Sequence, residues 1–196
     1  MPRFNEKEKA IIQEKLFSEG EKLFIKYGIK KVTIDDLVKA AGIAKGSFYA
    51  FCPSKEQLFL EIVFSNQNKM HDEIDNFIQK NKKLPPRELI KQAFIWILEQ
   101  TEQYPIFRMM DSETTEYLVR KVPRDVLESH THDDSAALLK FEQYGVRFSY
   151  DIQKVAKILQ TMSMCYFNPT QDDKDERLAT MNIIINGVLK EIVEDD

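Results

Sequence analysis

The sequence predicts an all-α protein, in which a three-helix N-terminal domain precedes a larger helical domain. Apolar residues recur at intervals of three and four along most of the chain, which is the spacing of one face of a helix. Several of these segments end at a glycine or a proline. A chain of 196 residues with 43% hydrophobic residues can bury a proper core. We expect residues 1–53 to form the first domain and residues 54–196 the second.

The first helix is predicted over Glu6–Tyr27, where apolar side chains lie on or near one face and Gly28 follows as a stop. The same helix carries three lysines, Lys7, Lys9 and Lys15. These lysines either form a solvated helix face or flank a polyanionic partner.

Two short helices around a glycine turn follow. Thr33 and Asp36 have the spacing of a capping box, in which each side chain binds the backbone N–H of the other. Gly42 ends this second helix, because glycine readily adopts the left-handed conformation common at helix C-termini. A third helix, predicted over Lys45–Phe51, begins three residues later. Two short helices joined in this way predict a helix-turn-helix motif.

The third helix is suited to meet a partner. Phe48 and Phe51 are expected to anchor it to the core, which leaves its other side chains exposed. A cation, a hydroxyl, a phenol and a glycine suit close approach to duplex DNA, where lysines and hydroxyls bind phosphates and helix N-termini reach base edges. The residues concerned are Lys45, Gly46, Ser47 and Tyr49.

A long fourth helix is predicted from Ser54 to about Lys80, started by a second capping box between Ser54 and Gln57. Lys55 lies in its first turn, where the helix dipole disfavours a cation. We therefore expect an anion near Lys55.

Residues 33–60, TIDDLVKAAGIAKGSFYAFCPSKEQLFL, resemble the N-terminal DNA-binding domain of the TetR family of bacterial transcriptional regulators. The resemblance covers roughly residues 8–65 and combines the turn glycine, the aromatic residues of the recognition helix and an F-x-x-K-E-x-L helix start. It implies an all-helical homodimer that binds a palindromic operator and releases it when a small molecule enters the C-terminal domain. By position, the residues that family members commonly use to contact DNA are Thr33, Lys45, Ser47, Tyr49 and Lys55.

Ala44 departs from the family pattern, in which a Ser or Thr usually caps the recognition helix. The loss of such a cap costs about 1 kcal/mol.

Charge is unevenly distributed along the chain, whose net charge is −4. Residues 1–70 hold 12 Lys and Arg against 9 Asp and Glu, whereas residues 71–196 hold 16 against 23. The basic part is the part expected to meet phosphates.

The second domain is rich in aromatic and Met side chains, which suit both a core and an adaptable apolar pocket. A helix over Arg87–Gln103 is apolar nearly all round and is expected to be central. With the family resemblance, we expect a pocket for an apolar or amphipathic effector. Its candidate residues are Phe94, Ile97, Phe107, Met110, Tyr117, Phe141 and Tyr144.

The polar segment Arg120–Asp134 is expected to be a surface loop, acting as a gate over the pocket. It contains His130, His132 and Asp133, whose alternation suits part of a metal site on an extended chain. No cysteine or further histidine joins them nearby, so a loop without metal is the preferred interpretation.

The last two helices are predicted over Asp151–Tyr166 and up to about Ile192, with Asn168 and Pro169 between them. Further apolar residues outside the main stripes, such as Ile183 and Ile184, exceed what one body can cover. We expect a four-helix bundle with a second subunit, and an intramolecular hairpin is the alternative. The interface residues predicted are Val155, Leu159, Met162, Tyr166, Met181, Ile185, Val188 and Ile192.

Enzyme motifs are absent from the sequence: it has no glycine-rich phosphate loop, G-x-S-x-G, H-E-x-x-H or C-x-x-C. No catalytic residue, cofactor or metal is expected.

No apolar segment is long enough to span a membrane, and the N-terminus is charged, so we expect a cytoplasmic protein. Two cysteines give no disulfide framework, and Cys52 is interpreted as a packing residue, with redox sensing as the alternative.

The sequence therefore predicts a dimeric, ligand-responsive DNA-binding regulator that acts as a repressor. The long helix from Ser54 would carry an event in the second domain to the two recognition helices. Two alternatives stay open: a DNA-binding protein without an effector, and a helical small-molecule carrier whose first domain no longer binds DNA.

Overall fold

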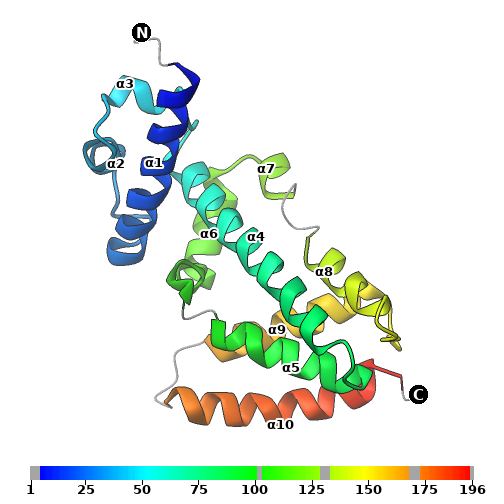
Figure 1. Ribbon diagram of the computed structural model, residues 1–196. Helices are drawn as coiled ribbons and strands as arrows, with labels where there is room; N and C mark the ends of the chain where they lie inside the picture. Colours follow the sequence, from blue (N-terminus) through cyan, green and yellow to red (C-terminus); the bar gives the residue numbers. More distant parts are fainter. Residues whose placement is uncertain (1–4, 101–102, 129–132, 168–172, 195–196) are drawn as a thin grey trace. The chain divides into compact units, whose positions relative to one another are not determined.

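The computed structural model describes residues 5–100, 103–128, 133–167 and 173–194, and it contains two compact units (Figure 1). Unit 1 comprises Met1–Gln67 and Tyr104–Glu128, and unit 2 comprises Asn68–Gln103 and Ser129–Asp196. This division differs from the boundary predicted at residue 53. Two further segments join the first unit because Ile106 and Leu118, among others, are buried in its core.

Unit 1 contains six helices and the beginning of a seventh within its described residues. They are α1 (Glu6–Tyr27), α2 (Ile34–Ala41), α3 (Lys45–Phe48), the first part of α4 (Lys55–Asn81), η2 (Pro105–Met109), α6 (Ser112–Lys121) and α7 (Arg124–Glu128). Their core includes Leu16, Phe24, Leu37, Phe48, Leu58, Phe59 and Ile62, all almost fully buried. The segment 105–128 thus completes the hydrophobic core around the helix-turn-helix.

Helix boundaries in unit 1 follow local signals. Asn5 and Glu8 form a capping box at the start of α1, and Gly28, with φ of 78°, ends it. The predicted range of this helix is confirmed. Gly42 takes the left-handed conformation, with φ of 73°, at the end of α2. Helix α3 is shorter than predicted, because after Phe48 the chain continues as a hydrogen-bonded turn rather than as a helix.

Helices α1 and α4 approach closely at Gly20. A Cβ atom at this position would lie 3.2 Å from Cδ1 of Ile62, so the Ile62 side chain would have to shift by a few tenths of an ångström to admit one. Phe24 and Phe59 pack edge to face nearby, with ring centroids 5.2 Å apart. Farther along α4, the buried amide of Asn66 donates to the Glu21 carboxylate over 2.9 Å. Packing and a polar contact together join α1 to the first part of α4.

Unit 2 contains the rest of α4 with α5 (Pro86–Gln100), α8 (Asp133–Glu142), α9 (Ile152–Phe167) and α10 (Lys174–Ile192). Helix α5 packs against α10. It buries one face, formed by Leu89, Ile90, Ala93, Phe94 and Leu98, whereas Ile95, Trp96 and Ile97 are half-buried. The apolar character predicted for this helix therefore divides between a core face and a partly exposed face.

The end of α10 is fixed to earlier parts of unit 2. The backbone N–H of Ser149 donates to the Ile192 carbonyl over 3.0 Å, and Phe148 and Val193 form an antiparallel bridge. The Arg87 guanidinium donates to the Val193 carbonyl over 2.8 Å. Lys140 on α8 pairs with Asp75 on α4 over 2.6 Å.

The segment Arg120–Asp134 is not the continuous loop that was predicted. Helix α6 runs to Lys121, and α7 follows over Arg124–Glu128, since Val126 and Leu127 pack on the unit 1 core. The metal hypothesis falls on His130 and His132, which lie outside the described residues. Within the residues described, no cluster of three potential metal ligands exists. No helix among them is long and apolar enough to cross a bilayer.

Candidate nucleic-acid interface

Thr33 fixes the start of α2, as the sequence predicted. Its hydroxyl oxygen accepts from the backbone N–H of Asp36 over 3.2 Å, and the Asp36 carboxylate accepts from the backbone N–H of Thr33 over 2.9 Å. The Thr33 hydroxyl also donates to the Asp36 carboxylate over 2.6 Å. This hydrogen bond, followed by the one from the backbone N–H of Thr33, favours the ionised carboxylate and lowers the pKa of Asp36. Thr33 is exposed, so its side chain is accessible to a partner.

Helix α3 presents three of its four predicted contact residues. Lys45 and Gly46 are exposed, and the phenol ring of Tyr49, 55% exposed, packs edge to face on Phe48. A Cβ atom added at Gly46 would meet nothing within 4 Å, so a duplex can approach the backbone closely there. Ser47, by contrast, is only 6% exposed, which corrects the expectation that it faces a partner freely.

Lys45 is already paired within the chain. Its ammonium donates to the Asp35 carboxylate over 2.9 Å, and this hydrogen bond raises the pKa of Lys45. Both side chains are more than half exposed, so the pair is weak and can be exchanged for a phosphate. Phe48 is fully buried and anchors α3, whereas Phe51 is half-buried.

Lys55 does not have the anionic partner that was predicted. Its ammonium donates to the backbone carbonyls of Ile29 over 2.8 Å and of Val32 over 2.6 Å. These carbonyls belong to the turn between α1 and α2. A cation in the first turn of α4 is therefore accounted for by neutral acceptors, and the sequence-based argument for an anion no longer holds.

The seven residues predicted to line one effector pocket belong to two separate cores. Phe107, Met110 and Tyr117 pack on the unit 1 core, whereas Phe94, Ile97, Phe141 and Tyr144 belong to unit 2. Phe94 and Phe141 are almost fully buried. The Tyr117 hydroxyl donates to Glu56, and the Tyr144 hydroxyl accepts from Gln79. The apolar surface of these residues is used for packing within each unit.

Two open hollows are present on the described part of the chain. One, of about 570 Å³, lies on unit 1 and is lined by Leu23, Tyr27, Lys31, Val32, Asp36, Lys39 and Ala40. The other, of about 260 Å³, lies on unit 2 and is lined by Phe77, Lys91, Gln92, Ile95, Trp96 and Glu99. The second hollow contains the stacked rings of Phe77 and Trp96, whose centroids are 5.3 Å apart.

The eight residues predicted for the dimer interface face the interior of their own chain. Seven are at most 9% exposed, and Val188 is half-buried against the same core. These side chains are already removed from water, so they have little surface left for a second subunit. Apolar residues that do remain exposed on α9 and α10 are Met164 at 59%, Ile183 at 75% and Ile184 at 43%.

Cys52 is a packing residue, as predicted. It is 2% exposed, and its Sγ lies 3.2 Å from the Ser54 carbonyl oxygen. Burial, with the nearby Glu61, raises the pKa of Cys52 to about 12. A thiol with this pKa is protonated at neutral pH, which disfavours the redox alternative.

A family model described as bacterial regulatory proteins of the tetR family matches residues 16–62, the segment that contains α1, α2, α3 and the start of α4. Over these residues the chain is similar to the TetR family. Regulators of this family bind DNA and act as dimers.

Two relatives from Bacillus subtilis are HTH-type transcriptional regulators. YhgD is 29% identical over 126 residues, which cover 60% of this chain and 65% of YhgD. YuxN is 27% identical over 164 residues, which cover 78% of this chain and 53% of YuxN. The matched segments thus span less than two thirds of either relative's length.

Solved structures extend the likeness of fold to the whole chain. A crystal structure of a TetR-family regulator from Pectobacterium atrosepticum superimposes with a TM-score of 0.69 and 16% identity, covering 98% of this chain and 99% of that one. TetR-family structures of this kind combine an N-terminal helix-turn-helix with a C-terminal helical domain, which confirms the predicted fold class.

Proposed function

We propose that this protein is a TetR-family repressor that binds a palindromic operator as a homodimer and leaves it when a small apolar or amphipathic molecule binds unit 2. The observation that carries the proposal is the exposed surface of α3, where Tyr49 stands beside the buried anchor Phe48. The Tyr49 ring is 55% exposed and combines a large apolar face with a polar hydroxyl, which is the combination that makes tyrosine common at interfaces. Because operator DNA is its partner, we place the protein in the cytoplasm.

The proposed DNA surface consists of Thr33, Lys45, Gly46 and Tyr49, with Lys55 behind it. Lys45 exchanges Asp35 for a phosphate, and the Thr33 hydroxyl, which donates to the Asp36 carboxylate in the free protein, exchanges that acceptor for another phosphate. Gly46 allows close approach, while Tyr49 reaches the base edges or the sugar. Lys55 acts mainly on the turn between α1 and α2, whose carbonyls it binds. Ser47 contributes only after a rearrangement that exposes its hydroxyl.

The proposed dimer forms through the exposed apolar residues of α9 and α10, Met164, Ile183 and Ile184, in place of the buried stripe. A four-helix bundle of two such helix pairs would remove these side chains from water. Ile183→Glu should therefore yield a monomer in sedimentation velocity at concentrations where the wild type is a dimer. Val119→Glu is the matched control, because Val119 is 62% exposed but lies on α6 in unit 1. A dimeric Ile183→Glu variant would contradict this interface.

The proposed effector site is the hollow on unit 2. Phe77, Ile95 and Trp96 give it an apolar floor, and Lys91 and Glu99 place one charge of each sign at its rim. Such a lining suits an amphipathic molecule. Phe94 and Phe141, from the pocket predicted by sequence, would support this floor from the core without contacting the ligand.

Trp96 is the only tryptophan of the chain, so its fluorescence reports directly on this hollow. We expect decanoate or decylamine, two amphiphiles of equal chain length and opposite charge, to change the emission of Trp96 and to release bound DNA at the same concentrations. Trp96→Phe is the control for the optical signal. DNA complexes that resist both amphiphiles, although Trp96 reports binding, would favour a DNA-binding protein without this effector response.

A further inference from the structure

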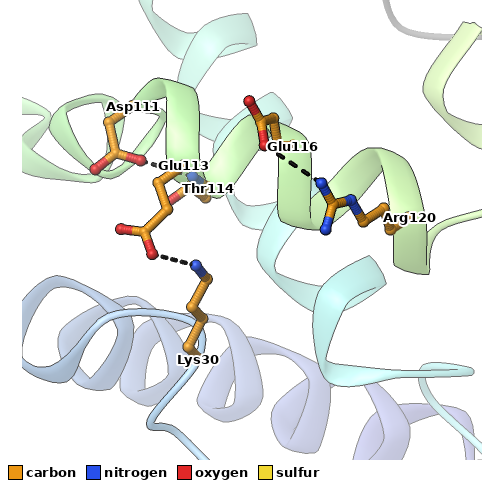
Figure 2. A network of polar contacts seen from close by, with 6 residues as sticks. All are labelled: Lys30, Asp111, Glu113, Thr114, Glu116 and Arg120. Carbon is orange, nitrogen blue, oxygen red and sulfur yellow. Dashed lines mark hydrogen bonds and ion pairs between the residues drawn. The ribbon is translucent and has the colours of Figure 1, made fainter.

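Helix α6 contacts the turn between α1 and α2 through an ion pair. The Lys30 ammonium, which projects from this turn, lies 2.6 Å from a carboxylate oxygen of Glu113 (Figure 2). The same ammonium lies 5.6 Å from the centroid of the Tyr117 ring, one helical turn farther along α6. Lys30 is thus held between a carboxylate and the face of an aromatic ring.

A second contact joins α6 to the start of α4. The half-buried Tyr117 hydroxyl donates to the Glu56 carboxylate over 2.6 Å. Hydrogen bonds to an ionised acceptor are stronger than neutral ones, and partial burial limits competition from water. This bond is therefore the stronger of the two, because the Lys30–Glu113 pair is largely exposed.

Both contacts converge on the backbone that precedes the helix-turn-helix. Lys55, the neighbour of Glu56, donates to the carbonyls of Ile29 and Val32 at either end of this turn. The next residue after Val32 is Thr33, the N-cap of α2. Any displacement of α6 would be transmitted along this path to α2, which is joined to α3 by only three residues.

The apolar side of α6 prevents such a displacement. Leu118, which follows Tyr117, is 1% exposed, and Ile106 of η2 is fully buried in the same core. At the N-terminus of α6, the Asp111 carboxylate accepts from the backbone N–H of Thr114 over 2.7 Å (Figure 2). Helix α6 therefore has a defined start, a buried anchor and two polar contacts, one to the α1–α2 turn and one to the start of α4.

We propose that Tyr117 and Glu113 are positioning residues for DNA recognition: they hold the α1–α2 turn, and through it α2 and α3, in the arrangement that fits the operator. Neither residue lies on α3. The inference depends on the DNA binding of the protein and is independent of the proposed effector. It predicts that removing one hydroxyl, in Tyr117→Phe, weakens operator binding without removing any DNA contact.

The test uses the duplex that the full-length wild-type protein enriches from a random-sequence DNA pool, with poly(dI-dC) as non-specific DNA. Tyr117→Phe should bind the enriched duplex between about twofold and thirtyfold more weakly, which is the range for residues that act through a coupled network. Binding to poly(dI-dC) should not change. Glu116→Gln is the matched control, because Glu116 lies on α6 but pairs only with Arg120, 3.5 Å away within the helix (Figure 2).

Two readouts separate positioning from simple destabilisation. Titration at stoichiometric concentrations counts active protein, so the dissociation constant can be corrected for any unfolded fraction. A plot of the logarithm of the DNA-binding constant against the logarithm of the salt concentration should keep its wild-type slope, because no phosphate contact is lost. Glu113→Lys should also weaken binding, and the double variant Glu113→Lys with Lys30→Glu should recover affinity, since the ion pair is restored with reversed charges.

Wild-type affinity in Tyr117→Phe would overturn the proposal. Weak binding that the reversed pair fails to restore would overturn the role assigned to Glu113. If Tyr117→Phe does not fold, the double variant Glu113→Lys with Lys30→Glu tests the proposal by itself, because both substituted side chains are exposed.

Discussion

Units 1 and 2 are stabilised in different ways. In unit 1, polar side chains bind specific backbone groups at helix ends and turns: Thr33 caps α2, Lys55 binds two carbonyls of the α1–α2 turn, and Asn66 joins α4 to α1. Unit 2 depends more on burial of an apolar core along α5, α9 and α10. Directional contacts fix a surface geometry, as a DNA-reading surface requires, whereas apolar cores tolerate repacking. The directional contacts of unit 1 therefore suit a DNA-reading surface, and the apolar core of unit 2 suits repacking.

The largest expected effect comes from Phe48→Ala, which removes the anchor of α3. Truncation of a fully buried Phe costs about 3–5 kcal/mol of unfolding free energy. We expect DNA binding to be lost, while the fluorescence of Trp96 in unit 2 remains that of the wild type at low temperature. Urea titrations followed by circular dichroism and by Trp96 emission measure both. Simultaneous loss of the Trp96 signal would mean that the two units unfold together, which would contradict their separate stabilisation.

A pair of substitutions on α10 tests the assignment of its faces. Ile185 is fully buried, so Ile185→Ala should lower the unfolding free energy by about 2–5 kcal/mol. Ile183 is 75% exposed, and Ile183→Ala should change the stability of the single chain by less than about 0.5 kcal/mol. Thermal unfolding of both variants in the Met164→Glu background, which is expected to be monomeric, avoids a contribution from the dimer. Equal losses of stability at the two positions would show that α10 buries a different face from the one assigned here.

How far the sequence predicted the molecule depends on the separation of the interacting residues. The capping box of Thr33 and the turn at Gly42 act within a few residues and were predicted. The two carbonyls bound by Lys55 lie 26 and 23 residues away, Glu56 lies 61 residues from Tyr117, and no local pattern indicates these partners. Periodicity placed Ile185 and Leu159 on apolar stripes correctly, but it does not distinguish a stripe that faces its own core from one that faces a second subunit.

A smaller effect is expected from Ala44→Ser. Ala44 is the N-cap of α3 and gives no side-chain hydrogen bond. A serine there should stabilise unit 1 by about 1 kcal/mol. Chemical denaturation measures the gain, and the affinity for the enriched duplex should rise with it. If the wild type enriches no duplex from the random pool and Ala44→Ser does, the carrier alternative would be supported, because the first domain of the wild type would then not bind DNA.

The smallest effect concerns acid stability. Hydrogen bonds from Thr33 lower the pKa of Asp36 from its ordinary value of 3.8 in the folded state. A depressed carboxyl pKa contributes stability above the unfolded value, and this contribution is lost as the pH falls below 3.8 through the folded pKa. Asp36→Asn should therefore reduce the difference in melting temperature between neutral and acidic pH. An unchanged pH profile would show that the capping box does not persist in solution.

DNA recognition by α3 is tested most directly by fluorescence anisotropy with the enriched duplex. We predict tight, salt-dependent binding by the wild type, much weaker binding to a scrambled duplex of equal length, and loss of this preference in Tyr49→Ala with unchanged melting temperature. Equal weak binding to both duplexes, or an unaltered preference in Tyr49→Ala, would contradict the assignment of the recognition surface.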